Sequence, residues 1–150
     1  MAESIFIEVV TPERAVLTGE CSEVILPGTE GQMGILPGHL PLLSGLAIGT
    51  MTVREFQPAG GGTSGTRRFM VDGGFVEVLP DKISIMTEAC AGQDEIDVAA
   101  ARVAIEEAEK QLLAVEDKAN AEEVEADVLK RHQDALRRAR MRLLTAEGEE

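Results

Sequence analysis

Aromatic side chains are scarce in this sequence, which has no Trp, no Tyr and four Phe among its 150 residues. Proteins that hold nucleic acid bases or cationic ligands commonly stack aromatic rings against them. That kind of binding is therefore a poor candidate for the function of this chain.

Residues that carry chemistry are equally few. The sequence has two histidines, His39 and His132, and no spacing of His and Cys resembles a metal site. No Gly-x-Ser-x-Gly or Walker motif occurs. We expect His132 to pack on an apolar helix stripe, and His39 to serve either a turn or a surface contact. The sequence therefore predicts no catalytic site, no metal site and no cofactor.

Targeting signals and basic stretches are also missing near the N-terminus, so no secretory signal is expected. In that setting Cys21 and Cys90 are expected to be reduced thiols rather than a disulfide. A net charge of −13 repels phosphate backbones, so nucleic acid is not expected as a direct partner. A hydrophobic share of 44% is enough for a core.

One apolar stretch stands out, EGQMGILPGHLPLLSGLAIG at residues 30–49, and after Glu30 no charged residue follows until Arg54. Pro37 and Pro41 would each break a helix, so the stretch is not a membrane span and any membrane association is expected to be indirect. Four leucines are expected mostly in the core: Leu40, Leu42, Leu43 and Leu46. Three side chains are expected to face outward as contacts: Gln32, Met33 and His39.

The first 90 residues are patterned as strands and turns. Alternation in SIFIEVV places Ile5, Ile7 and Val9 on one face of a strand. The glycine-rich residues 58–65 predict a hairpin tip. Strands at this spacing indicate a β-sandwich or a barrel.

Residues 67–88 predict three short strands. Asp72-Gly73 is expected to join the first two and Pro80-Asp81 the next two, because both pairs suit tight turns.

From about Asp94 the composition turns helical, with Asp94 as the expected N-cap. A first apolar stripe at helical spacing comprises Val98, Ala101, Ile105, Ala108, Leu112 and Val115. Glu116–Asn120 is expected to end this helix. A second stripe comprises Val124, Val128, His132, Ala135, Ala139 and Leu143. Two helices with a short polar link predict an antiparallel hairpin.

Both stripes are rich in Ala, which contributes less on burial than the ~1.5–3 kcal/mol of a larger aliphatic side chain. The hairpin is therefore expected to be detachable. Its first arm is acidic, whereas residues 130–142 are basic. The basic run is either complementary to the helix dipole and the first arm, or a contact for an acidic partner.

Three blocks of the sequence are characteristic of one family. They are residues 30–49, the block FMVDGGFVEVLPDKISIMTE, and DEIDV at the start of the first helix. Together they resemble the epsilon subunit of bacterial and chloroplast F-type ATP synthase, over nearly the whole chain.

The resemblance implies a flattened β-sandwich at 1–90 followed by an antiparallel two-helix hairpin at 91–150. It implies a non-catalytic rotor subunit in the central stalk, peripheral at the cytoplasmic face of the bacterial cell membrane. The sandwich would bind the gamma subunit and the c-ring, and the hairpin would reach the alpha and beta subunits and restrain ATP hydrolysis. Candidate gamma and c-ring contacts are Glu30, Gln32, Met33, Gly34, His39 and Leu42. Candidate beta-subunit contacts are Lys130, Arg131, Arg137, Arg138 and Arg140.

Some members of that family bind ATP through a motif similar to Ile-Asp-x-x-Arg-Ala. Here Ile96-Asp97 is kept, but Ala100-Ala101 follows and Arg102 comes too late. If ATP binds at all, Asp97 and Arg138 are the residues expected to contact it. We expect weak or absent binding, because the first arm carries glutamates that would repel a triphosphate.

A different class of function is an alternative. Transcript-cleavage factors of RNA polymerase also insert a helical hairpin into an enzyme channel. An acidic tip formed by Glu116, Asp117, Glu122 and Glu123 would suit that role by holding magnesium.

Overall fold

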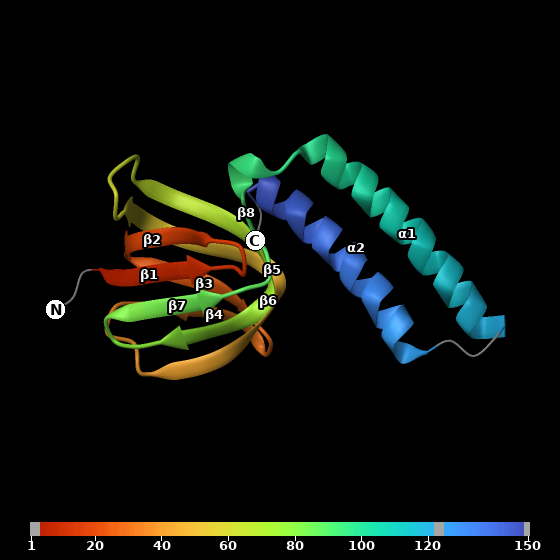
Figure 1. The fold of residues 1–150 in the computed structure, drawn as a ribbon, viewed down its shortest axis with the longest axis horizontal. Helices are drawn as coiled ribbons and strands as arrows, with labels where there is room; N and C mark the ends of the chain where they lie inside the picture. Colours follow the sequence, from red (N-terminus) through yellow and green to blue (C-terminus); the bar gives the residue numbers. More distant parts are fainter. Residues whose placement is uncertain (1–3, 122–124, 149–150) are drawn as a thin grey trace.

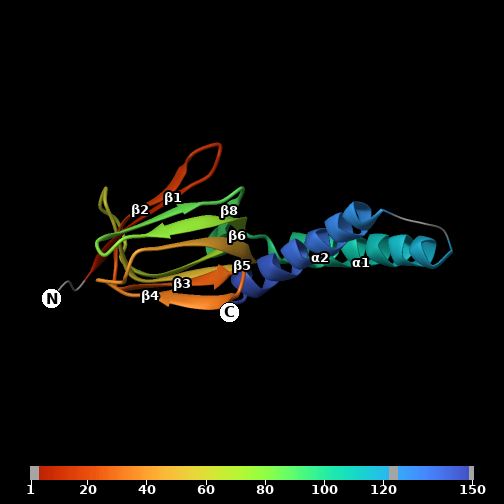
Figure 2. The same cartoon turned by 90° about the horizontal axis from the view of Figure 1, so that it is seen from below.

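The computed structural model describes residues 4–121 and 125–148. Two parts follow one another along the chain, a β-sandwich and a pair of helices that projects from one end of it (Figures 1 and 2). The strands of the described residues are β1 (Ile5–Val10), β2 (Ala15–Cys21), β3 (Glu23–Gly28), β4 (Gly31–Ile35), β5 (Leu42–Pro58), β6 (Gly65–Val78), β7 (Lys82–Met86) and β8 (Cys90–Gly92). A short 3₁₀ turn, η1 (Gln93–Glu95), leads into α1 (Val98–Ala121) and α2 (Ala126–Ala146). The expected β-sandwich and two-helix C-terminus are confirmed.

Two long strands, β5 and β6, hold both layers of the sandwich together. They pair antiparallel along nearly their whole lengths, from Leu42 opposite Val78 to Phe56 opposite Gly65. The C-terminal part of β5 also pairs with β3, and the C-terminal part of β6 pairs with β7. β7 in turn pairs in parallel with β1. The order β4-β3-β5-β2-β1-β7-β6-β8 thus folds one continuous sheet into two layers.

The core lies between these layers and is built from the inward side of each strand. The predicted face of Ile5, Ile7 and Val9 is fully buried, which confirms the alternation in β1. Val76 and Ile85 form an inward cross-strand pair and are also buried. Each such side chain contributes ~1.5–3 kcal/mol on burial, so this cluster stabilises the sandwich.

A pair of glycines bends β6 instead of ending it. The expected turn at Asp72-Gly73 was wrong, because Gly65–Val78 is one strand. Gly73 and Gly74 have φ values of 69° and 102°, a conformation that side chains disfavour. A Cβ at Gly74 would collide with the main-chain oxygen of Met86. Residues 67–86 therefore form two strands, with a bend where a turn was expected.

The other two turn predictions are confirmed. Residues 58–65 connect β5 to β6 as a hairpin tip. Pro80-Asp81 lies between β6 and β7, where Leu79 N–H donates to Lys82 O at 2.8 Å.

Replacing Gly74 by Ala is predicted to destabilise the protein by about 2 kcal/mol, because both the φ value and the close Met86 carbonyl oppose a side chain. The free energy of unfolding from urea titration measures the loss. Gly60→Ala is the matched control, since open space surrounds that position and its φ is not positive. Equal stability of the two variants would contradict the account of the bend.

The two helices form the expected hairpin with some shifts in detail. Asp94 lies in η1, and the cap of α1 is Asp97, whose Oδ1 accepts a hydrogen bond from Ala100 N–H at 3.1 Å. Glu116–Asn120 does not end the helix, because α1 continues to Ala121. Ala101 and Ala108 are buried, as the first stripe predicts.

The second stripe was partly wrong, and its first member, Val124, lies outside the described residues. Ala135 is exposed, and its neighbour Leu136 is the buried side chain. His132 is partly buried, and its Nδ1 lies 2.8 Å from Val128 O, as a packed histidine would. Leu136 lies four residues after His132 and three before Ala139, so it belongs to the same face of the helix.

Both cysteines are free thiols in the sandwich. Burial raises the pKa of Cys21 from 9.0 to about 12, and the charge of Glu20 adds to the effect. Burial and the charge of Glu95 raise the pKa of Cys90 to about 12 as well. At neutral pH these thiols are therefore protonated and poor nucleophiles.

Candidate functional site

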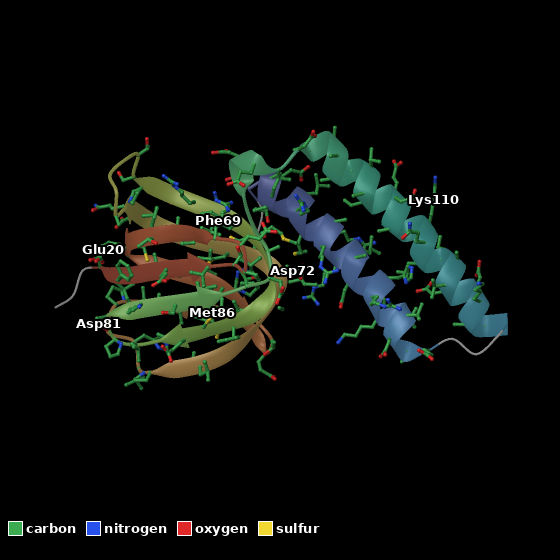
Figure 3. The ribbon with its side chains drawn as sticks, viewed as in Figure 1. Glu20, Phe69, Asp72, Asp81, Met86 and Lys110 are labelled. Atoms are coloured by element: carbon green, nitrogen blue, oxygen red, sulfur yellow. The ribbon has the colours of Figure 1, made fainter. Side chains whose placement is uncertain are left out.

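The middle of the apolar stretch, residues 36–41, is an exposed loop between β4 and β5. Gly38 N–H donates to Pro80 O at 2.9 Å, which fixes the loop beside the turn that contains Asp81. Figure 3 shows Asp81 at the end of the sandwich remote from the helices. His39 Nδ1 lies 2.7 Å from Leu40 O, so the ring stabilises the loop's own backbone. The side chain of Leu40 is left 79% exposed.

An uncovered sheet face continues from this loop. Leu43 is 69% exposed, Phe75 46% and Met86 39%, although each lies in a regular strand. Phe75 pairs directly with Met86, and Leu43 pairs with Glu77, two residues along β6. An open cavity of about 290 Å³ lies next to them, lined by Val10 and Phe75 among others. We call Leu36, Leu40, Leu43, Phe75 and Met86 the apolar docking surface.

The expected place of the leucines was wrong in two cases. Both belong to the apolar docking surface: Leu40 lies in the exposed loop before β5, and Leu43 lies on the side of β5 that points away from the core. Leu46 is buried as expected, and Leu42 packs partly against the core. Period-two alternation in LPLLSGL would have signalled the exposed position of Leu43.

The other contact candidates lie on the edge strand β4 and its turn. Glu30, Gln32 and Gly34 are exposed there. Met33 pairs with Leu26 and packs partly against the core, so it offers less surface than expected. His39 is half-buried in its loop. Phe75 and Met86 were missed, because their block was interpreted as three short strands with an unknown outward face.

A second candidate surface is formed where α2 meets the sandwich. α2 lies between α1 and the sandwich (Figure 1). Thr145 is buried against β5, and its Oγ1 lies 2.8 Å from Thr50 Oγ1. Gln93 Nε2 donates to Ala146 O at 3.3 Å. A small apolar cluster of Met70, Ile96 and Ala101 receives Met141 and Leu143 of α2.

One ion pair joins α2 to the bend of β6. Arg138 Nε donates to Asp72 Oδ2 at 2.7 Å, and the Asp72 side chain is 19% exposed. Asp72 lies where the sheet meets the helices (Figure 3). Together with the Thr50–Thr145 hydrogen bond, this pair forms what we call the hairpin latch.

The basic candidates of α2 therefore have different roles in this conformation. Arg138 is held by the sandwich, and Arg140 Nη2 lies 3.4 Å from Glu109 Oε1 of α1. Lys130, Arg131 and Arg137 form no ion pair within the described residues. Pairing with the first arm thus accounts for Arg140 alone among these candidates, and Lys130, Arg131 and Arg137 are left available for a partner.

The two candidate ATP contacts are engaged separately. Asp97 caps α1, whereas Arg138 binds Asp72. Arg102 donates to Glu147 at 3.3 Å, so it is also occupied. Within the described residues no group of His, Cys, Asp and Glu could hold a metal ion. Within the same residues no helix is long and apolar enough to cross a membrane.

Comparison with known proteins decides the family. A family model described as "ATP synthase, Delta/Epsilon chain, beta-sandwich domain" matches residues 4–92. The ATP synthase epsilon chain of Syntrophobacter fumaroxidans is 40% identical over 147 residues, covering 98% of each chain. This chain belongs to the ATP synthase epsilon chain family. The epsilon chain of Desulforapulum autotrophicum is 38% identical over 148 residues, again covering 98% of each chain.

A solved structure supports the fold of the whole chain. A chain of the Euglena gracilis mitochondrial ATP synthase, in its OSCP/F1/c-ring assembly, superposes with a TM-score of 0.73 at 22% identity. The match covers 99% of this chain and 84% of the other. Sandwich and hairpin thus occur together in a protein of similar architecture. Family membership also displaces the alternative of an RNA polymerase factor, whose proposed acidic tip includes Glu122 and Glu123, outside the described residues.

Breaking the hairpin latch is predicted to loosen α2 from the sandwich. Asp72→Asn or Arg138→Gln removes a half-exposed ion pair that contributes about 1 kcal/mol, which is roughly a fivefold shift toward undocked α2. Amide hydrogen exchange at residues 139–146 measures the shift.

Arg140→Gln is the matched control, because its partner Glu109 belongs to the hairpin itself. The charge-swapped pair Asp72→Arg with Arg138→Asp should recover part of the protection. The latch is refuted if the control loosens residues 139–146 as much as Arg138→Gln does.

Proposed function

We propose that this chain is a non-catalytic rotor subunit of a proton-translocating F-type ATP synthase, connecting the gamma subunit to the c-ring. The observation that carries the proposal is the apolar docking surface on a member of this family. An exposed cluster of large apolar side chains on a small domain is typical of a protein–protein contact. Its place at the cytoplasmic face of the bacterial cell membrane would then come from its partners.

The two parts of the apolar docking surface are assigned to different partners by their position on the sandwich. Leu40 and Leu36 lie in the loop at the end remote from the hairpin, which suits the c-ring. Leu43, Phe75 and Met86 lie on the flat face of the sandwich, which suits gamma. The polar edge of Glu30, Gln32 and Gly34 would form the rim of either contact.

Replacing Leu40 and Leu43 by Glu is predicted to weaken assembly by at least tenfold. Each leucine would contribute ~1.5–3 kcal/mol when a partner covers it. Binding of the full chain to gamma and c-ring, and proton-driven ATP synthesis, are the measurements. Leu113→Glu is the matched control, because Leu113 of α1 is equally exposed but lies on the hairpin. Normal assembly of the double variant would sink the proposal.

The hairpin is proposed to restrain ATP hydrolysis by leaving the sandwich and placing α2 against the catalytic subunits. The latch supports this, because Arg138 can pair with Asp72 or with an acidic segment of the beta subunit, but not with both. Two exclusive sets of contacts for one helix are what a two-state element requires. Few latch contacts keep the two states close in free energy.

Replacing Lys130, Arg131, Arg137 and Arg138 by Ala is predicted to relieve inhibition of ATP hydrolysis in the assembled enzyme. Truncation after Gly92, where β8 ends, should relieve it as well and leave a folded sandwich that still binds gamma. Hydrolysis rates of assembled enzyme measure both effects. Unchanged inhibition in the fourfold variant would assign these charges to the dipole and the first arm.

ATP is proposed to bind the hairpin weakly or not at all. Glu106, Glu107 and Glu109 stand on α1 where the ATP-binding members carry arginine. Asp97 and Arg138 already have partners, which supports the same conclusion. A dissociation constant below roughly 100 μM in calorimetry on the isolated chain would contradict this.

A further inference from the structure

The sheet has an open edge beside the hairpin tip at residues 58–65. β8 pairs with β6 only from Phe69 to Val71, and the chain then leaves the sheet as η1. Asp72 N–H donates toward the β8 side, to Ala89 O at 3.1 Å. Alternate residues of an antiparallel strand direct their backbone groups to the same side. Thr66 therefore directs its N–H and C=O groups, and Arg68 its N–H group, to an edge where no strand follows within the described residues.

An open cavity of about 490 Å³ runs along this edge. One wall is β6 with the preceding loop, residues 63–69, and the other is residues 92–95 at η1. The hydroxyl groups of Thr63, Ser64 and Thr66 add further polar atoms to the first wall. The cavity is thus a groove with polar groups on both walls, beside the open edge of β6.

Arg68 contributes a buried donor that has no acceptor. Its Nε is buried and forms no hydrogen bond within the described residues. A buried donor left unsatisfied costs free energy, so native structures normally provide a partner. The neighbouring Arg67 is different, because it donates to Thr63 O at 2.9 Å and lies over the Phe56 ring at 5.2 Å. Arg68 lines the groove and forms no ion pair within the described residues, so its guanidinium is the group that a carboxylate of an occupant would meet.

The charges of the groove select the kind of occupant. A carboxylate would pair with Arg68, and extended backbone would pair with Thr66 and Arg68. Asp94 and Glu95 on the opposite wall would repel a strongly anionic ligand such as a triphosphate. If two copies of this chain paired through the same edge, the Arg68 side chains of the two copies would lie close together. Repulsion between these like charges disfavours such a dimer.

We propose that the groove between β6 and η1 binds an extended peptide segment of a partner protein as an added strand. The segment carries one Asp or Glu, which accepts a hydrogen bond from Arg68, between neutral or basic residues. Such binding goes beyond the stalk contacts, because the groove uses neither the apolar docking surface nor the hairpin latch.

The test uses the full isolated chain and a synthetic probe, the acetylated and amidated heptapeptide Thr-Val-Thr-Asp-Thr-Val-Lys. We expect saturable NMR shifts of the Thr66 and Arg68 amides. A matched peptide with Asn for Asp should bind about tenfold more weakly, because a charged hydrogen bond is lost. Arg68→Gln should weaken the Asp peptide by a similar factor and the Asn peptide hardly at all.

Lys110→Gln is the control for net charge, since Lys110 lies on α1 far from the sandwich (Figure 3). It should leave peptide binding unchanged. The proposal is overturned if the Thr66 and Arg68 amides do not respond, or if the Asp and Asn peptides bind equally. It is also overturned if the Thr66 and Arg68 amides are already protected from hydrogen exchange in the free chain. Protection that is independent of protein concentration would mean that the chain itself covers the edge. Protection that rises with protein concentration would mean that a second copy covers it.

Discussion

The rest of the structure depends on the continuous pairing of β5 with β6 and on the bend that Gly73 and Gly74 allow in it. On one side of the bend, Leu43 and Phe75 lie on an uncovered outer face. On the other side, Thr50, Met70 and Asp72 form the seat of α2. One ladder thus positions both candidate surfaces and holds them in a fixed relation. Side chains in place of these glycines would strain the bend on which the relation between the two surfaces depends.

The contacts of α2 with its seat are fewer than those in the core of the sandwich. Buried aliphatic side chains fill the sandwich, whereas a small apolar cluster that includes Met141 and Leu143, one threonine pair and one partly buried ion pair connect the helices to it. A half-exposed ion pair contributes little, because water competes for both partners. The sandwich can therefore remain folded while the hairpin moves. An acidic partner could bind Lys130, Arg131 and Arg137 without breaking an ion pair with the sandwich, because these residues form none within the described residues. The stability of the sandwich and the weaker attachment of the hairpin both follow from where the large apolar side chains lie.

Alternation and helical spacing predicted most of the fold, since burial of Ile5, Ile7 and Val9 or of Ala101 and Ala108 follows from periods of two and 3.6 residues. These periodicities gave wrong predictions where one short sequence pattern is compatible with two structures. Asp72-Gly73 suits a hairpin turn and also a strand bend, and only the pairing with β5 decides between them. Leu40 and Leu43 look like core residues because composition does not report which side of a strand or loop is left exposed. The pairing of Arg138 with Asp72 joins residues far apart in the sequence, and no spacing predicts it.

The central claim is that α2 cannot both sit on the sandwich and inhibit the enzyme. Thr50 and Thr145 offer a direct test, because their Oγ1 atoms are 2.8 Å apart only when the hairpin is docked. Replacing both by Cys allows a disulfide to lock that state in the assembled ATP synthase. The account predicts full ATP hydrolysis in the oxidised enzyme, return of inhibition on reduction, and unchanged proton-driven synthesis. An oxidised, locked enzyme that remains inhibited would contradict it.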